Sequence, residues 1–207
     1  MSEKTEGNFD ITVGPLVNAW GFGPTTKNTL SKTQVDSLLQ LVNYKKVILK
    51  DNQIVKVNPE IKIDFNAIAQ GYSVDVLADF LERKGINNYL VELGGEIKAK
   101  GKKENEEWKV GIDQPTEEKS PERKLEAIIS LKNRALATSG NYRKFYIEGN
   151  QKLSHIIDPK TGYPAKHNLL STTVIADDGI TADAYATAFM VMGIKKIDCF
   201  FRKKTKT

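Results

Sequence analysis

The sequence contains few of the residues that build disulfides and sulfur-rich metal sites. Its 207 residues include one cysteine, Cys199, and two histidines, His155 and His167. A single cysteine excludes an internal disulfide and a cysteine-based metal site. Two histidines without further cysteines also argue against a zinc site, which takes its ligands mainly from these two residue types. The composition therefore argues against the disulfide-rich and zinc-binding classes of protein.

Long apolar runs and a strong excess of one charge are also absent. No run approaches the roughly 18 apolar residues that a membrane helix needs, and the polar start, Met1–Glu6, shows no signal peptide. The net charge is +5, from 31 Lys and Arg against 26 Asp and Glu. Basic residues at 98–103 are followed at once by glutamates, a mixture typical of a solvated face. We expect no transmembrane segment in this chain and no nucleic-acid partner.

Length and pattern predict a single large domain of the α+β class. Segments that read as strands, such as 9–13 and 61–65, outnumber helices and do not alternate regularly with them. This favours mixed or antiparallel sheets with a few packed helices over a parallel doubly wound sheet. The clearest helix is predicted at about 67–84, where an apolar stripe is followed by Gly85. A hairpin turn is predicted at Asp51 and Asn52, and the strands 96–100 and 108–112 are expected to pair with each other.

Segment 181–187 carries the most informative spacing. Asp183 and Thr187 are four residues apart in what we predict to be the first turns of a helix, so their oxygens share one face. A carboxylate and a hydroxyl among small alanines suit a hard cation that must also reach a phosphate. In the structural alternative, Thr181 caps the helix and Asp183 favours its positive end. The first interpretation predicts magnesium-dependent handling of a phosphorylated ligand.

Segment 63–72 allows a ligand or an ion to approach the main chain. Asp64 ends a predicted strand, and the small residues Ala67 and Ala69 leave the backbone uncovered. The alternative is that Asp64 or Asn66 is simply the N-cap of the following helix.

Segment 155–162 combines a histidine with turn chemistry. His155 precedes Asp158, Pro159 and Gly162, an ordinary turn pattern in which proline takes the second position. The histidine is therefore either structural or catalytic.

Taken together, these segments resemble the ApbE family of flavin transferases, which move FMN from FAD onto a protein. The resemblance runs from about residue 6 to residue 193, and the order and spacing of the motifs carry it rather than any single motif. The matching segments are Gly7–Asn18 with Trp20–Gly23, Asp64–Tyr72, Val91–Gly95, Trp108–Ile112, Ala137–Tyr142, Ser154–Pro159 and Ala182–Ala184.

The resemblance implies a magnesium site and an FAD site. The Mg²⁺ would be held by the main-chain carbonyl of Ala67 with Asp183 and Thr187, and Ala186 would lie close by. His155 would stand beside the pyrophosphate. Many relatives carry a lysine where this sequence has Gln70, so any help from that charge is lost here. The residues expected to touch FAD are Asn8, Phe9, Asp10, Asp64, Gln70 and Ile157.

The resemblance also implies the chemistry. FMN would pass from FAD to a Thr or Ser hydroxyl of an acceptor protein, of the redox-complex subunit type, with release of AMP. Splitting a pyrophosphate requires charge neutralisation, which a Mg²⁺ ion on the phosphate oxygens supplies. Asp183 and His155 are the candidates for activating the hydroxyl. The alternatives are an FAD pyrophosphatase that gives FMN and AMP, and a flavin-binding fragment without turnover.

By the same resemblance, residues 1–193 form an ApbE-like domain with an incomplete N-terminal part, and residues 194–207 form an atypical basic tail. Members of the family usually work in the periplasm or on the outer face of the bacterial membrane, often as lipoproteins. We therefore expect that location, although no export signal is visible in the sequence.

Overall fold

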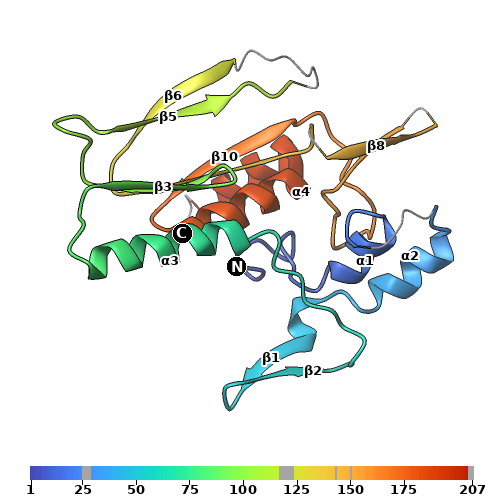
Figure 1. The fold of residues 1–207 in the computed structure, drawn as a ribbon. Coiled ribbons are helices and arrows are strands. Elements are labelled where there is room, and N and C mark those ends of the chain that lie inside the picture. Colours follow the sequence, from blue (N-terminus) through green and yellow to red (C-terminus); the bar gives the residue numbers. More distant parts are fainter. Residues whose placement is uncertain (25–28, 117–123, 143, 150, 205–207) are drawn as a thin grey trace. The chain divides into compact units, whose positions relative to one another are not determined.

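The computed structural model of the chain describes residues 1–24, 29–116, 124–142, 144–149 and 151–204 (Figure 1). Within it, the chain divides into two compact units. The first unit comprises Met1–Phe65, Lys144–Asn168 and Val191–Thr207, and the second comprises Asn66–Arg143 and Leu169–Met190.

A four-stranded sheet forms the centre of the second unit. Its strand order is β10-β7-β4-β3, and every neighbouring pair is antiparallel. The strands are β3 (Tyr89–Leu93), β4 (Glu96–Lys100), β7 (Ala135–Gly140) and β10 (Ser171–Ala176). Gly94 and Gly95 join β3 to β4 with positive φ angles of 67° and 112°, which suit glycine. The antiparallel sheet with its packed helices confirms the predicted α+β class.

One face of this sheet is covered by a second pair of strands. These are β5 (Trp108–Asp113) and β6 (Leu125–Leu131), which pair antiparallel with each other. Ile97 and Leu136 of the sheet form a buried cluster with Val110 and Leu131 of this pair. Because side chains alternate along a strand, the neighbours of Ile97 on β4 point to the opposite face.

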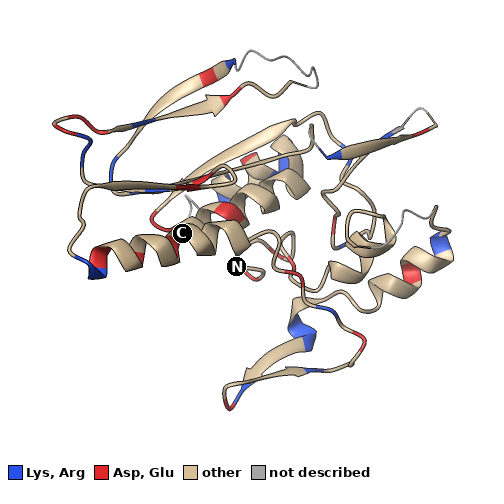
Figure 2. Ribbon diagram, in the orientation of Figure 1, with Lys and Arg blue, Asp and Glu red and all other residues tan. Residues whose placement is uncertain are grey.

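Two helices pack on that opposite face. In α3 (Ala69–Arg83), Glu82 accepts a hydrogen bond of 2.7 Å from Lys100 of β4, and acidic and basic residues meet at the C-terminal end of this helix (Figure 2). In the first half of α4 (Gly179–Lys204), Ala182 and Ala186 pack against Ala137 of β7. Strand alternation therefore gives the sheet an apolar face and a face that meets the two helices through small and charged residues.

Helices α3 and α4 approach each other closely where they begin. A Cβ atom on Gly71 would lie 2.3 Å from the carbonyl oxygen of Gly179, so only glycine fits this crossing. Asp75 of α3 accepts hydrogen bonds from the amides of Gly179 and Ile180, at 2.7 and 2.9 Å. These contacts bring the start of α4 against the first turns of α3.

The first unit has its own apolar core. Its elements are α1 (Gly14–Ala19), α2 (Lys32–Leu39), η1 (Tyr44–Lys46), β1 (Val47–Lys50), β2 (Gln53–Lys56), β8 (Phe145–Glu148) and β9 (Gln151–Ser154). Ser31 caps α2 in a capping box with Gln34. The buried cluster joins segments far apart in sequence, and its members are Leu16, Trp20, Val35, Val42, Leu153 and Ile157.

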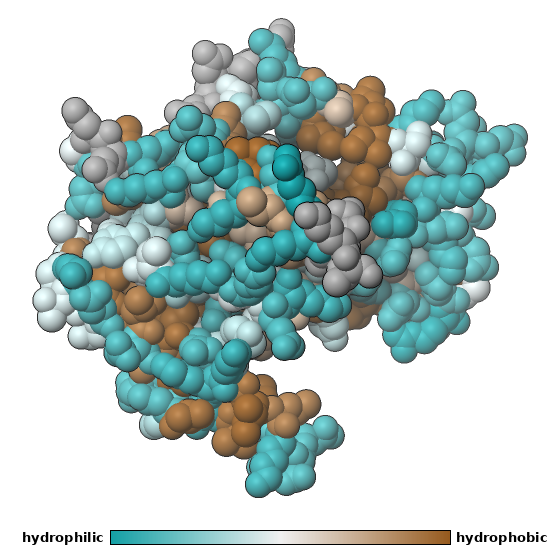
Figure 3. All heavy atoms as spheres, turned by 180° about the vertical axis from the view of Figure 1, so that it is seen from behind, coloured by the Kyte–Doolittle hydropathy of each residue, from teal (hydrophilic) through white to brown (hydrophobic). Residues whose placement is uncertain are grey.

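The β1–β2 hairpin confirms the turn predicted at Asp51 and Asn52. Both turn residues have positive φ, 49° and 61°, as a two-residue hairpin turn of this type requires. Apolar side chains of the hairpin are exposed, among them Leu49 at 74% and Val57 at 75%. The hairpin carries part of the brown surface at the bottom of Figure 3. The turn and the strand pairing, rather than the burial of apolar side chains, therefore stabilise the hairpin.

Three predictions about strands were wrong. Residues 9–13 form bends and turns that lead into α1, and residues 61–65 have no regular secondary structure. Strands β4 and β5 do not pair with each other, because β4 lies between β3 and β7 while β5 pairs with β6. Alternation misled the prediction for 9–13, where Asp10 and Thr12 are both buried and hydrogen-bonded to each other outside any sheet.

The predicted basic tail is largely helical. Residues 194–204 continue α4 after an interruption at Gly193, which has φ 70° and ψ 163°. Residues 205–207 lie outside the described part of the chain. Among the described residues, the helices are all too short or too polar to span a bilayer.

Candidate functional site

Asp183 is the central residue of the site in the second unit. It lies in the first turns of α4 and is only 5% exposed. Its Oδ2 accepts one hydrogen bond, of 3.0 Å, from the main-chain amide of Gly71. Burial raises the pKa of this carboxyl, and the Gly71 amide offsets part of the rise. A buried carboxylate with a single neutral donor is costly unless a cation joins it.

A main-chain oxygen is available at Ala67, just before α3. The helix begins at Ala69 with Ile68 as its N-cap, so the amide of Gly71 in the first turn has no acceptor within the helix. Here that amide is taken by Asp183, and the next amide, of Tyr72, donates to Ile68. Within the described residues, the carbonyl of Ala67 accepts no hydrogen bond. The carboxylate of Asp183 therefore accepts the first-turn amide of α3, while the carbonyl of Ala67 keeps its lone pairs.

The other two predicted metal residues lie one turn further along α4. Thr187 shares a 3.1 Å hydrogen bond with the hydroxyl of Ser139 on β7. The carbonyl of Ala186 accepts a 2.8 Å hydrogen bond from Thr172, and its side chain is buried among small residues. The Thr187 hydroxyl thus retains an oxygen lone pair for a ligand, whereas the Ala186 carbonyl already has a partner.

The structural alternatives for these residues are wrong. The N-cap of α3 is Ile68, whose side chain makes no capping hydrogen bond, so neither Asp64 nor Asn66 is the N-cap. Helix α4 begins at Gly179, before Thr181, and Asp178 accepts the hydrogen bond from the Thr181 amide. Asp183 binds an amide of α3 instead of one in its own helix.

Glu96 is a functional candidate that the sequence patterns did not single out. It is the first residue of β4, and it is 5% exposed. Its Oε2 is buried and has no hydrogen-bond partner among the described residues. Burial, together with the nearby charge of Asp183, raises the pKa of Glu96 to about 7. In the sequence, Glu96 directly follows two glycines and precedes Lys98 and Lys100, and this pattern was the signal that could have identified it.

The donor set fits a hard divalent cation. A buried carboxylate, a free main-chain carbonyl and a hydroxyl are all oxygen ligands, and Mg²⁺ commonly takes one or two carboxylates together with substrate phosphates. In the part of the chain that the structure describes, no three His, Cys, Asp or Glu side chains cluster as a metal site. A cation here would therefore depend on ligands of mixed type and on the substrate.

Gln70 lies beside this site. Its side chain is exposed and rests against Gly94, since a Cβ atom there would be 1.8 Å from the Gln70 Nε2. The glycine thus allows the first turn of α3 to lie against the β3–β4 turn that precedes Glu96.

The first unit contains His155, which follows strand β9. Its Nδ1 lies 3.1 Å from the carbonyl oxygen of Lys144. A carbonyl oxygen only accepts hydrogen bonds, so Nδ1 carries hydrogen here and Nε2 of the neutral ring keeps its lone pair. Burial lowers the pKa of His155 and favours this neutral form. The arrangement equips Nε2 to accept a proton.

The predicted flavin-contact residues near the N-terminus differ in how many of their polar atoms form hydrogen bonds. Asn8 donates to the carbonyl of Thr5 at 2.7 Å, while its buried Oδ1 has no partner among the described residues. Phe9 is buried, and its amide donates to the Thr5 hydroxyl. Both carboxylate oxygens of Asp10 accept hydrogen bonds, from Thr12 and from the Tyr44 amide. Asn8 therefore retains an acceptor for a ligand, and the Asp10 carboxylate stabilises the local fold.

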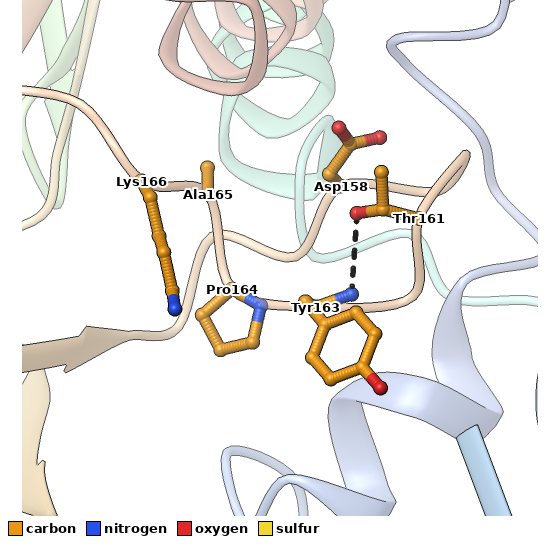
Figure 4. Close-up of a pocket in the computed structure, with 6 residues that line it drawn as sticks. All are labelled: Asp158, Thr161, Tyr163, Pro164, Ala165 and Lys166. Carbon is orange, nitrogen blue, oxygen red and sulfur yellow. Dashed lines mark hydrogen bonds between the residues drawn. The ribbon is translucent and has the colours of Figure 1, made fainter. Parts of the chain in front are cut away.

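The remaining predicted contacts in this unit are Asp64 and Ile157. The amide of Asp64 donates to the Ile11 carbonyl at 2.7 Å, and Ile157 is buried in the apolar core. The turn that follows Ile157 lines a cavity of about 440 Å³ (Figure 4). Asp158, Tyr163 and Lys166 are among its lining residues, so acidic, aromatic and basic groups surround it. The size of this cavity lies within the range of small-molecule sites.

The chain matches the model of the ApbE family over residues 1–207. It is 41% identical over 203 residues to an FAD:protein FMN transferase of Haemophilus influenzae, covering 95% of this chain and 58% of that protein. Among solved structures it is similar to the flavin transferase ApbE of Vibrio cholerae, with a TM-score of 0.82 and 37% identity, over 96% of this chain and 63% of the other. It is also similar to the apo form of the Pseudomonas stutzeri flavinyl transferase ApbE, with a TM-score of 0.86 and 33% identity, over 99% and 63% of the two chains. The chain thus spans less than two thirds of these relatives.

Proposed function

Because this chain belongs to the ApbE family, we propose that it transfers FMN from FAD to a Thr or Ser hydroxyl of an acceptor protein, with Mg²⁺ as cofactor. The observation that carries the proposal is the buried Asp183, which accepts one hydrogen bond, from Gly71, while the nearby Ala67 carbonyl accepts none among the described residues. The names of the relatives support the reaction, and the donor set supports the cation.

The proposed reaction exchanges one phosphoester partner for another. The acceptor hydroxyl oxygen forms a bond to the FMN phosphorus of FAD, and the bond from that phosphorus to the bridging oxygen breaks. AMP leaves with the bridging oxygen, and the proton of the hydroxyl passes to a base. No oxidation or reduction of the flavin is required, so the protein acts by positioning and electrostatics.

The chain's own residues would divide this work. Asp183, the carbonyl of Ala67 and Thr187 would hold the cation, with Ala186 nearby in α4. Bound Mg²⁺ would supply neutralisation of the charge on the pyrophosphate oxygens. His155, neutral and with the lone pair of Nε2 available, is suited to take the proton of the acceptor hydroxyl. Asp183 is the alternative base.

FAD would be recognised mainly by the first unit. The buried Oδ1 of Asn8 offers an acceptor, and the cavity after Ile157 offers aromatic and apolar walls. Phe9, Asp10, Asp64 and Gln70 complete the predicted contact set. We also infer from the family that the protein acts in the periplasm or on the outer face of the membrane, on an acceptor of the redox-complex subunit type.

The reaction is tested with the 207-residue chain, FAD, Mg²⁺ and a purified acceptor subunit that carries a Thr flavinylation site. Intact-protein mass spectrometry should show the addition of one FMN to the acceptor and an equal amount of AMP in solution. An acceptor variant with that Thr changed to Val is the matched control and should remain unmodified.

The alternatives give different products. An FAD pyrophosphatase would release free FMN and AMP and leave the acceptor unmodified. A flavin-binding fragment without turnover would raise the thermal midpoint in the presence of FAD but release no AMP. Either result would overturn the proposed transfer.

A further inference from the structure

The face of β4 that meets the helices carries three charged residues in a row, Glu96, Lys98 and Lys100. Each lysine has an acidic partner on α3. Lys100 lies 2.7 Å from Glu82, and Lys98 lies 4.0 Å from Asp75. The two lysine positions are therefore balanced by a charge of opposite sign.

Glu96 breaks this pattern, because the charge it meets has the same sign. The charged group that influences it is Asp183 of α4, another buried carboxylate. Glu96 is only 5% exposed, and its Oε2 has no hydrogen-bond partner among the described residues. Native proteins seldom leave a buried carboxylate oxygen in this state unless a ligand or an ion completes it.

The neighbourhood keeps Glu96 close to the helix starts. Gly94 admits the side chain of Gln70, and Gly71 admits the backbone of α4 at Gly179. A Cβ atom on Gly71 would also lie 2.7 Å from the Cβ of Asp183. The glycines therefore pack the β3–β4 turn against the first turn of α3, and the first turn of α3 against the first turns of α4. Glu96 directly follows this β3–β4 turn, and Asp183 lies in the first turns of α4.

We propose that Glu96 is a second acidic residue of the cation site, and that its carboxylate acts together with Asp183 to bind and position the divalent ion. The proposal rests on the proposed function for the presence of the ion. It adds a residue from the sheet to a site otherwise built from α4 and the segment before α3. Two buried carboxylates would balance the two positive charges of the ion. Neither lysine of the row is left to neutralise these carboxylates in its place, because each lysine already has an acidic partner.

The test measures Mn²⁺ binding to the metal-free chain without FAD, from the electron paramagnetic resonance signal of free Mn²⁺. We expect Glu96→Gln, which keeps the shape of the side chain, to weaken binding about tenfold or more. Glu96→Asp, which keeps the charge, should recover part of that loss. Glu92→Gln is the matched control, because Glu92 is exposed and alternation places it on the opposite face of the same hairpin. It should bind Mn²⁺ as the unchanged chain does.

A second readout separates a role in metal binding from a role in folding. Without metal, Glu96→Gln should unfold at the same or a higher temperature than the unchanged chain, because a like-charge contact is removed. With Mg²⁺ added, the unchanged chain should gain more thermal stability than the variant. A variant that unfolds at a lower temperature with and without metal would show a structural role and overturn the proposal.

The Asp183→Asn variant distinguishes a failure of the proposed metal site from a failure of the proposed role of Glu96. If Asp183→Asn loses Mn²⁺ binding while Glu96→Gln keeps it, the proposed metal site stands and the role of Glu96 is wrong. If Glu96→Gln binds more tightly, Glu96 holds a proton that competes with the ion, and the proposal is again wrong. If the unchanged chain binds no Mn²⁺, or Asp183→Asn binds it normally, both the metal site and the role of Glu96 are overturned.

Discussion

The two units each contain a buried aspartate, and the two residues are satisfied in opposite ways. Asp10 in the first unit accepts three hydrogen bonds, from the Thr12 amide, the Thr12 hydroxyl and the Tyr44 amide, at 2.8, 2.6 and 2.8 Å. Asp183 in the second unit accepts one, from Gly71, and its charge acts on another buried carboxyl group, that of Glu96. Their exposures, 8% and 5%, are nearly equal.

This difference separates a structural carboxylate from a functional one. Neutral donors converge on Asp10 and compensate its charge, so removal of the charge should cost stability. Among the described residues, Asp183 has one neutral donor and the Oε2 of Glu96 has none, so removal of one charge should cost little stability but should remove the binding of a cation. Burial alone therefore does not distinguish the two roles. The number of hydrogen-bond donors and the charge of the neighbouring groups do.

The largest expected effect is that of Asp183→Asn on FMN transfer. The amide retains the size of the carboxylate but loses its charge, so we expect a rate reduced by about a hundredfold or more. The thermal midpoint of the metal-free chain should be unchanged or higher. Asp177→Asn is the control, since Asp177 is exposed and lies just before the same helix. Transfer at the normal rate by Asp183→Asn would exclude Asp183 from the chemistry.

Asp10→Asn should show the opposite pattern. The new NH₂ group would face an amide or hydroxyl donor in place of an acceptor, and we expect the free energy of unfolding to fall by about 2 kcal/mol. Urea denaturation measures the change. Asp36→Asn, at an exposed position of α2, should leave the denaturation midpoint almost unchanged. A variant of Asp10 that is as stable as the unchanged chain would contradict the structural role.

A smaller effect concerns the pH dependence of stability in the first unit. Burial holds the pKa of His155 below the ordinary value of 6.5, so around pH 6.5 the unfolded chain takes up a proton that the folded chain does not. Stability is therefore fully present above pH 6.5 and is lost as the pH falls through the lower folded pKa. In His155→Gln, the loss of stability on acidification should be smaller. Thermal melts between pH 8 and pH 5, at about unit steps, measure it, and identical slopes in both proteins would contradict the buried neutral histidine.

Local sequence patterns predicted helix α3, the helical start of α4 and the β1–β2 hairpin. The apolar spacing and the following glycine predicted a helix at about 67–84, and α3 spans Ala69–Arg83. The residue pair Asp51 and Asn52 predicted the β1–β2 turn, whose positive φ angles those residues tolerate. The four-residue spacing of Asp183 and Thr187 does fall within a helix, α4. These features depend on neighbours within about four residues, which a single sequence displays directly.

The sequence by itself determined the helix that carries Asp183, the class of the fold and the family. Tertiary structure alone decided that β4 pairs with β7 and not with β5, and that Glu96 lies within the electrostatic influence of Asp183. It also decided that the amide of Gly71 donates to Asp183. The physical reason is that strand partners and helix crossings are chosen by packing between residues far apart in the chain. A strand pattern such as that of 96–100 states which side chains share a face, but not which charge that face will meet.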